Sequence, residues 1–188
     1  MFSKFKLKLT ATCIAAIVVA LLSQGTLAYY STAYKTTNVV TSGDIQFIIH
    51  EKTERGENFP IDGVYIVPGD IVSKEVSFEN SCNHPFYLRV KLVPSVDSEE
   101  LSSDNWFGLY IDEENWISKD GWYYYKGVVE PEKTTPTLFN RVEIIGENVD
   151  NNHLGKTLSL SVVAQAVQSE NNPVDGTDTY TASGWPKE

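Results

Sequence analysis

The chain has 188 residues, with 15 basic and 25 acidic side chains and a formal net charge of −10. A polyanion repels phosphate backbones, so this charge disfavours nucleic-acid binding, and a 41% hydrophobic content excludes a disordered chain. The length predicts one domain, since domains run to about 150 residues. Two cysteines, Cys13 and Cys82, are too few for a disulfide scaffold.

Residues 1–28 have the organisation of a secretory signal peptide. Three lysines precede an apolar run of 12 residues, Ala11–Leu22, which is shorter than the ~20 residues that span a bilayer. Thr26-Leu27-Ala28 ends in a small residue, so cleavage is expected between Ala28 and Tyr29. The mature protein would then be secreted, and would touch a membrane only through the uncleaved signal peptide. An uncleaved membrane anchor is the alternative.

Alternating apolar and polar residues predict strands along most of the mature chain. The clearest strand is Phe86–Leu92, with an apolar and a basic face, and Pro94 is expected to end it. A helical turn is expected at Leu101–Asp104. The other expected strands are Ile45–Ile49, Val64–Val67, Val72–Asn80, Trp106–Ile111, Asn115–Ser118, Trp122–Lys126, Leu138–Ile145 and Lys156–Val167. The fold class is therefore predicted to be all-β, a jelly-roll-like antiparallel β-sandwich over residues 44–168.

Turn residues separate these strands. Pro68-Gly69-Asp70 is a turn signal between two of them, and Asp120-Gly121 predicts a tight hairpin. After the sandwich, residues 169–188 form a polar, turn-rich tail. This tail is expected to be loosely held and pinned by Trp185.

Residues 29–43 form an N-terminal segment with strand-forming character, carrying Tyr30, Tyr34, Thr36, Val39 and Val40 and no proline or glycine before Gly43. An isolated strand is weak because its backbone groups lack partners. Placed on an open sheet edge of another copy, the segment would gain a row of hydrogen bonds, which is β-augmentation. Pairing within its own domain, or disorder, remains open as an alternative.

Motifs for catalysis are missing from the sequence. Zincins use HExxH, which does not occur, and the three histidines His50, His84 and His153 are scattered. There is also no GxSxG motif and no glycine-rich phosphate loop, and Asp175–Asp178 lacks the spacing of an EF-hand. No catalytic residue, metal or cofactor is therefore expected, and Cys82 is interpreted as a buried small residue rather than a nucleophile.

The residues Trp122, Tyr123, Tyr124 and Tyr125 form an aromatic run. On a strand, Trp122 and Tyr124 face one way and Tyr123 and Tyr125 the other. One pair must then lie in the core or in an interface, which is the ordinary use of aromatic residues in a sandwich. The alternative is an exposed platform for sugars, in which case the protein would be a secreted carbohydrate-binding module.

Several phrases resemble one family when taken in order. They are Gly25–Thr32 at the leader junction, Thr36–Ile45, Val67–Asp70 with Val76–Asn80, Tyr87–Val90, Asp120–Lys126 and Ala164–Gln168. Together they resemble the TasA/camelysin family of exported biofilm-matrix proteins of Gram-positive bacteria.

This resemblance implies a jelly-roll subunit that polymerises into extracellular fibres, alone or with related matrix subunits. It also implies export through a SipW-type signal peptidase, and a mature N-terminal segment that becomes a strand of the neighbouring subunit. Because camelysin was named as a metalloprotease, a metallopeptidase is a further alternative, although no residue pattern here supports it.

Overall fold

The computed structural model describes residues 30–31, 36–38, 45–61, 63–97, 99–100, 106–148 and 157–186. Several residues singled out above lie outside these ranges. They are the whole of residues 1–28 with Thr26 and Ala28, then Tyr29, Tyr34, Val39, Val40, the turn expected at Leu101–Asp104, and His153. The signal peptide and its cleavage site therefore stay predictions.

The described residues form strands with two short 3-10 turns, so the expected all-β class is confirmed. The strands are β1 (Tyr30–Ser31), β2 (Thr36–Asn38), β3 (Phe47–Lys52), β4 (Tyr65–Ile66), β5 (Ile71–Ser73), β6 (Glu75–Asn80), β7 (Phe86–Val96), β8 (Glu99–Glu100), β9 (Phe107–Ile111), β10 (Trp116–Lys119), β11 (Trp122–Tyr125), β12 (Phe139–Ile144) and β13 (Leu158–Gln168). The turns are η1 (Gly146–Asn148) and η3 (Thr179–Thr181). Within these residues, no helix is long and apolar enough to cross a membrane.

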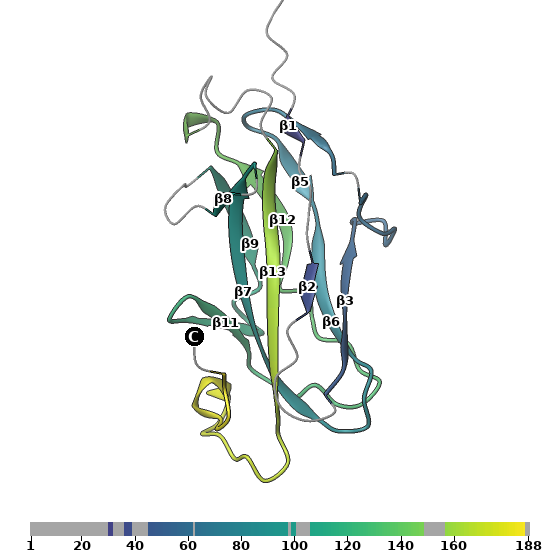
Figure 1. Ribbon diagram of the computed structural model, residues 1–188, viewed down its shortest axis with the longest axis vertical. Coiled ribbons are helices and arrows are strands. Elements are labelled where there is room, and N and C mark those ends of the chain that lie inside the picture. The colour runs from purple at the N-terminus through teal and green to yellow at the C-terminus, as the bar shows by residue number, and fades with distance from the viewer. Residues whose placement is uncertain are drawn as a thin grey trace, which may run out of the picture.

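One layer has the strand order β10-β11-β7-β13-β2. Its centre is the antiparallel pair β7–β13, which stays in register from Val96 opposite Leu158 to Phe86 opposite Gln168. Figure 1 shows these two strands side by side along the long axis of the molecule. Their length makes them the frame on which the shorter strands are added.

The second layer contains β3, β5, β6, β12 and β9. β3 pairs with β6, and β12 lies between β5 and β9. The β3–β6 pair is joined to the β5–β12–β9 group because the chain just before β12 runs beside β6. Leu138 N–H donates to Val76 O (2.7 Å), and Thr135 N–H donates to Phe78 O (2.9 Å). The result is a two-layer antiparallel sandwich.

The core lies between the layers and follows the alternation predicted from the sequence. Val76 and Phe78 on β6 are fully buried, as are Leu88 and Val90 on β7 and Ala164 on β13. Each large apolar side chain buried in this way contributes about 1.5–3 kcal/mol. The core is therefore what holds the two layers face to face.

The prediction that Pro94 ends its strand was wrong. β7 continues to Val96, and Pro94 lies opposite Leu160 of β13. A proline lacks an N–H group and is tolerated where one side of a strand has no partner. On the side of β7 away from β13, the described pairings are those of β11 with Arg89 and Val90 and of β8 with Ser95 and Val96, so none of them involves Pro94.

The aromatic hairpin forms as predicted from Asp120-Gly121. Lys119 pairs with Trp122, and both central residues have positive φ, 51° at Asp120 and 78° at Gly121. Positive φ at both positions is the geometry of a type I′ turn, whose twist matches that of the strands.

The tail after β13 is more closely packed than the sequence suggests. Ala182 is buried against Tyr87 and Val167, with Trp185 packed beside them. Thr179 is buried and its hydroxyl donates to Tyr125 O (2.7 Å). The described part of the tail, which Figure 1 draws in yellow, thus covers part of the outer face of the β7–β13 layer.

Candidate assembly site

The edge of β13 that faces away from β7 is the first candidate site. It is occupied by β2, which runs parallel to β13 with Thr36 opposite Val162, Thr37 opposite Val163 and Asn38 opposite Ala164. All the other pairings among the described strands are antiparallel. Within the described residues, β2 covers only three of the eleven residues of β13.

The beginning of the N-terminal segment reaches a second place on the domain. Tyr30 lies opposite Ile66 and Ser31 opposite Tyr65, so that β1 pairs with β4. Two of the residues predicted for a donor strand, Tyr30 and Thr36, are therefore placed on sheet edges of their own domain. The single subunit shows the self-paired arrangement that the sequence left open, and it identifies the edge that this segment covers.

The turn at Pro68-Gly69-Asp70 lies next to β4. Asp70 N–H donates to Val67 O (3.0 Å), and the Asp70 carboxylate accepts from Val67 N–H (2.8 Å). Gly69 has φ of 92°, which favours glycine, and its N–H donates to Ile144 O (2.9 Å). The turn therefore attaches the start of β5 to the end of β12.

Large apolar side chains are exposed around this turn. Tyr65 is 77% exposed, Ile71 is 55% exposed and Val67 is 45% exposed. They flank the place where β1 pairs with β4. If the N-terminal segment were withdrawn, this end of the domain would expose still more unpaired backbone.

The aromatic run does not form an open platform. Trp122 and Tyr124 are 4% and 5% exposed and lie on the outer face, where the Arg89 guanidinium lies over the Trp122 ring and the tail contacts Tyr124. The ring of Tyr124 meets those of Tyr180 and Trp185 edge-on, with centroids 6.0 Å and 5.6 Å apart. A stacking surface for sugars at Trp122 and Tyr124 would require the tail to leave.

Tyr123 and Tyr125 point the other way, as predicted, and pack against the core. Burial raises the pKa of both phenols. The ring of Tyr125 lies 5.4 Å from that of Trp116. These two tyrosines therefore serve mainly as core residues of the hairpin.

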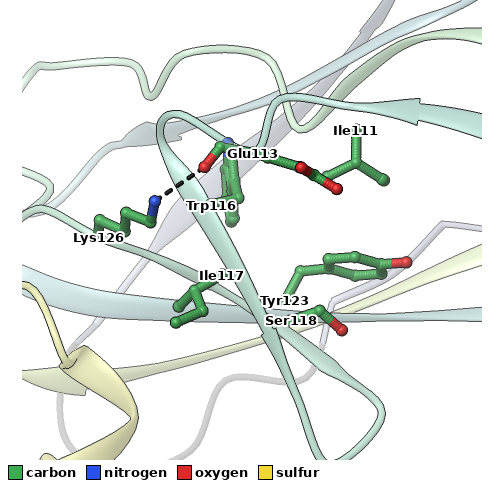
Figure 2. A pocket seen from close by; sticks show the side chains of 7 residues that line it. All are labelled: Ile111, Glu113, Trp116, Ile117, Ser118, Tyr123 and Lys126. Carbon is green, nitrogen blue, oxygen red and sulfur yellow. Dashed lines mark hydrogen bonds between the residues drawn. The ribbon is translucent and has the colours of Figure 1, made fainter.

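A shallow hollow of about 340 Å³ lies between β9 and the hairpin. Figure 2 shows the seven side chains that line it, among them Ile111, Tyr123 and Lys126. The Lys126 ammonium donates to the backbone oxygens of Glu113 (2.8 Å) and Glu114 (3.1 Å). This lysine thus closes the loop between β9 and β10, and the hollow holds no nucleophile paired with a base.

The two histidines that the structure describes each lie near a different acid. His50 Nε2 lies 2.6 Å from Glu79 Oε2, and His84 Nδ1 lies 3.9 Å from Glu170 Oε2. In the part of the chain that the structure describes, no three His, Cys, Asp or Glu side chains converge as metal ligands would. Cys82 is half-buried, and its thiol lies 3.3 Å from the backbone oxygen of His84.

The structure also shows features that the sequence interpretation missed. Arg89 lies in a strand face predicted to be wet, yet it is 7% exposed because the tail covers it. Lys74 alternates with Val72 and Val76 and is fully buried. The placement of Lys74 in phase with apolar residues was the available signal, whereas nothing local indicates where the tail lies.

Comparison with protein families gives one match. A sequence profile for camelysin metallo-endopeptidases matches residues 4–112. The chain belongs to this family. The resemblance to the TasA/camelysin group is thereby confirmed, and with it membership of an exported, cell-surface-associated family. No curated protein and no solved structure matches the chain.

Within this camelysin-family chain, the matched residues include the N-terminal segment, the turn at Pro68-Gly69-Asp70 and the strands up to β9. The aromatic hairpin, β12, β13 and the tail lie beyond the match. The candidate assembly edge on β13 and the segment that covers it therefore come from different parts of the chain, of which only the segment lies within the family match.

Proposed function

We propose that this protein is a secreted structural subunit of the extracellular biofilm matrix. In this proposal a SipW-type signal peptidase cleaves between Ala28 and Tyr29, and the freed segment 29–43 is donated to a neighbouring copy or a related matrix subunit. The protein thereby forms or joins fibres. Its role is structural rather than catalytic, with no catalytic residue, metal or cofactor.

The observation that carries this proposal is the pairing of the N-terminal segment on the outer edge of β13. Within the described residues, the outer edge of this eleven-residue strand is paired over three residues, and these partners come from the N-terminal segment. A longer donor strand would complete more of this edge. Each added backbone hydrogen bond contributes about 0.5–1.5 kcal/mol net, so several extra pairs favour exchange between copies.

Family membership and chain chemistry support the same role. The segment has strand-forming residues and only one charged side chain, Lys35, so its chemistry suits an edge inside a sheet. A head-to-tail contact of this kind need not close on itself, and a contact that does not close propagates into filaments. A carbohydrate-binding role gains no support from the aromatic run, because Arg89 lies over the Trp122 ring and the tail contacts Tyr124, so that both rings are buried.

A strand-capture measurement tests the proposal. A mature chain lacking residues 29–41 is expected to keep its fold by circular dichroism and to bind a synthetic peptide of residues 29–41 at one site in calorimetry. A scrambled peptide of the same composition is the control and is expected not to bind. A truncated chain that is folded but does not bind the native peptide would contradict donor pairing.

A further inference from the structure

The two ends of the sandwich differ in how the N-terminal segment meets them. β13 runs from Leu158, opposite Val96, to Gln168, opposite Phe86. β3, the first strand of the sandwich after the N-terminal segment, begins near the Gln168 end of β13, because the ring of Phe47 lies 6.1 Å from that of Phe86. The segment is thus tethered at the Gln168 end of its own domain.

In the single subunit, β2 is the described part of the segment that lies beside β13, and it runs parallel to β13. Its first strand, β1, lies by β4 near the end where β13 begins, and β2 follows further along β13 (Figure 1). Asn38 lies opposite Ala164, six residues or about 20 Å from Leu158 at the rise of an extended strand. This geometry suits a chain that folds back onto its own domain.

The same orientation does not suit a polar fibre. In a stack of like-oriented copies, the Gln168 end of the donor's domain faces the Leu158 end of the acceptor. If the donor strand kept the parallel register, its residue 38 would lie about 20 Å inside the Leu158 end of the acceptor, measured along β13. The seven residues from there to Ile45 span at most about 25 Å, and they would have to turn back, retrace this distance and cross to the next domain.

An antiparallel donor meets no such constraint. Its residue 38 then lies near the Leu158 end, next to the domain from which it comes, and Tyr30 lies deeper in the acceptor. The donor strand and the acceptor's β13 would then be antiparallel, as β7 and β13 are on the other side of β13. Antiparallel pairing is also slightly more stable per residue than parallel pairing.

We infer that assembly reverses the N-terminal segment, which lies parallel to β13 in the single subunit and antiparallel to the neighbour's β13 in the fibre. The inference rests on the proposed function. In the single subunit, the parallel pairing acts as a temporary cap on the acceptor edge. An exchange that kept the parallel register would join two Gln168 ends and give closed dimers instead of fibres.

Two cysteine pairs in the mature chain distinguish these orientations, each in a Cys82→Ala background. Ser31→Cys with Tyr65→Cys reports the position that the segment has in the single subunit, because these residues are direct partners in the β1–β4 pair. Asn38→Cys with Ser159→Cys reports the reversed strand. In the parallel state residue 38 lies opposite Ala164, five residues or about 17 Å from residue 159, beyond a cross-linker of roughly half that reach.

In monomers, oxidation is expected to link residues 31 and 65 within one chain and to block fibre formation until the disulfide is reduced. In fibres assembled under reducing conditions, the cross-linker is expected to join residues 38 and 159 of different copies, while residues 31 and 65 stay unlinked. Cross-linked peptides are identified by mass spectrometry.

Fibres with links between residues 31 and 65 of different copies would overturn the reversal and leave donor exchange intact. Fibres in which neither pair links copies would also overturn it. Failure of donor exchange itself has a different signature, since a chain without residues 29–41 would then assemble like the intact one.

Discussion

Lys74 is a fully buried lysine whose ammonium lies 3.2 Å from the Glu51 carboxylate and 4.8 Å from the centre of the Phe59 ring. Burial lowers its pKa from 10.5 to about 8, and the nearby Glu51 charge opposes this shift only in part. At neutral pH, burial of the charged ammonium therefore lowers the free energy of unfolding.

The free energy of unfolding is expected to rise with pH between about 8 and 10.5. In this window the folded lysine has lost its proton while the unfolded one keeps it, so the unfolded state binds more protons and stability increases with pH. The full gain is about 3 kcal/mol. Urea unfolding at pH 7, 8 and 9 measures its first part, before tyrosines ionise. A Lys74→Met variant should lose the slope, and equal slopes in both proteins would contradict this assignment.

Arg89 connects the tail to the sheet. Its guanidinium lies 4.1 Å from the ring centre of Trp122 and 5.0 Å from that of Trp185. It also donates to Gln165 Oε1 (2.6 and 2.9 Å) and to the backbone oxygen of Pro186 (2.8 Å). One buried cation therefore satisfies acceptors on β13 and on the tail at the same time.

An Arg89→Ala change is expected to destabilise the protein by about 2–3 kcal/mol, because it leaves partly buried acceptors on β13 and on the tail without this charged donor. Proteolysis within residues 169–186 should become faster. Lys91→Ala is the matched control on the same strand, since its ammonium lies 5.7 Å from the ring centre of Trp122 and such a contact is worth about 0.5–1 kcal/mol. Unchanged proteolysis in Arg89→Ala would show that the arginine does not hold the tail.

At the scale of elements, the sequence predicts strands better than it predicts their partners. Period-2 alternation locates β6, β9 and β13, and Asp120-Gly121 locates the hairpin, because both are local signals. The prediction at Pro94 was wrong because a strand accepts a proline where no neighbouring strand needs its N–H group, and this depends on which strands lie beside β7. The pairing of β2 with β13 joins residues far apart in the sequence, and no local pattern encodes it.

The tail is the element whose removal has the clearest expected effect. Ending the chain after Gln168 would uncover Tyr124, which is now 5% exposed. It would also remove Trp185 and Pro186 from around the Arg89 guanidinium that lies over the Trp122 ring. Tryptophan emission should shift to longer wavelength and unfolding should occur at a lower temperature, because apolar burial is lost. Trp185 is lost with the tail, so Trp185→Phe is the control for emission. A truncated chain with the same melting temperature as this control would show that the tail only rests on the sheet.

At the scale of the whole molecule, net charge opposes assembly. The chain carries −10 overall, and the part after residue 28 holds 12 basic and 25 acidic side chains. Copies therefore repel each other before short-range strand pairing can act. The screening length falls from about 30 Å at 0.01 M salt to about 10 Å at 0.1 M.

Fibre growth is accordingly expected to accelerate severalfold between 0.01 M and 0.15 M sodium chloride, followed by light scattering or thioflavin fluorescence. Growth that slows with added salt would mean that attraction between opposite charges, and not strand pairing against a net repulsion, drives association. A truncated chain without residues 29–41 provides the background signal at each salt concentration.

The central claim is that the segment freed at Tyr29 completes a sheet in another copy. Electron microscopy of the purified mature chain, beside an equally folded chain lacking residues 29–41, tests it most directly. We predict fibres from the intact chain and only separate subunits from the shortened one at equal concentration. Fibres of equal number and length from both chains would contradict the account.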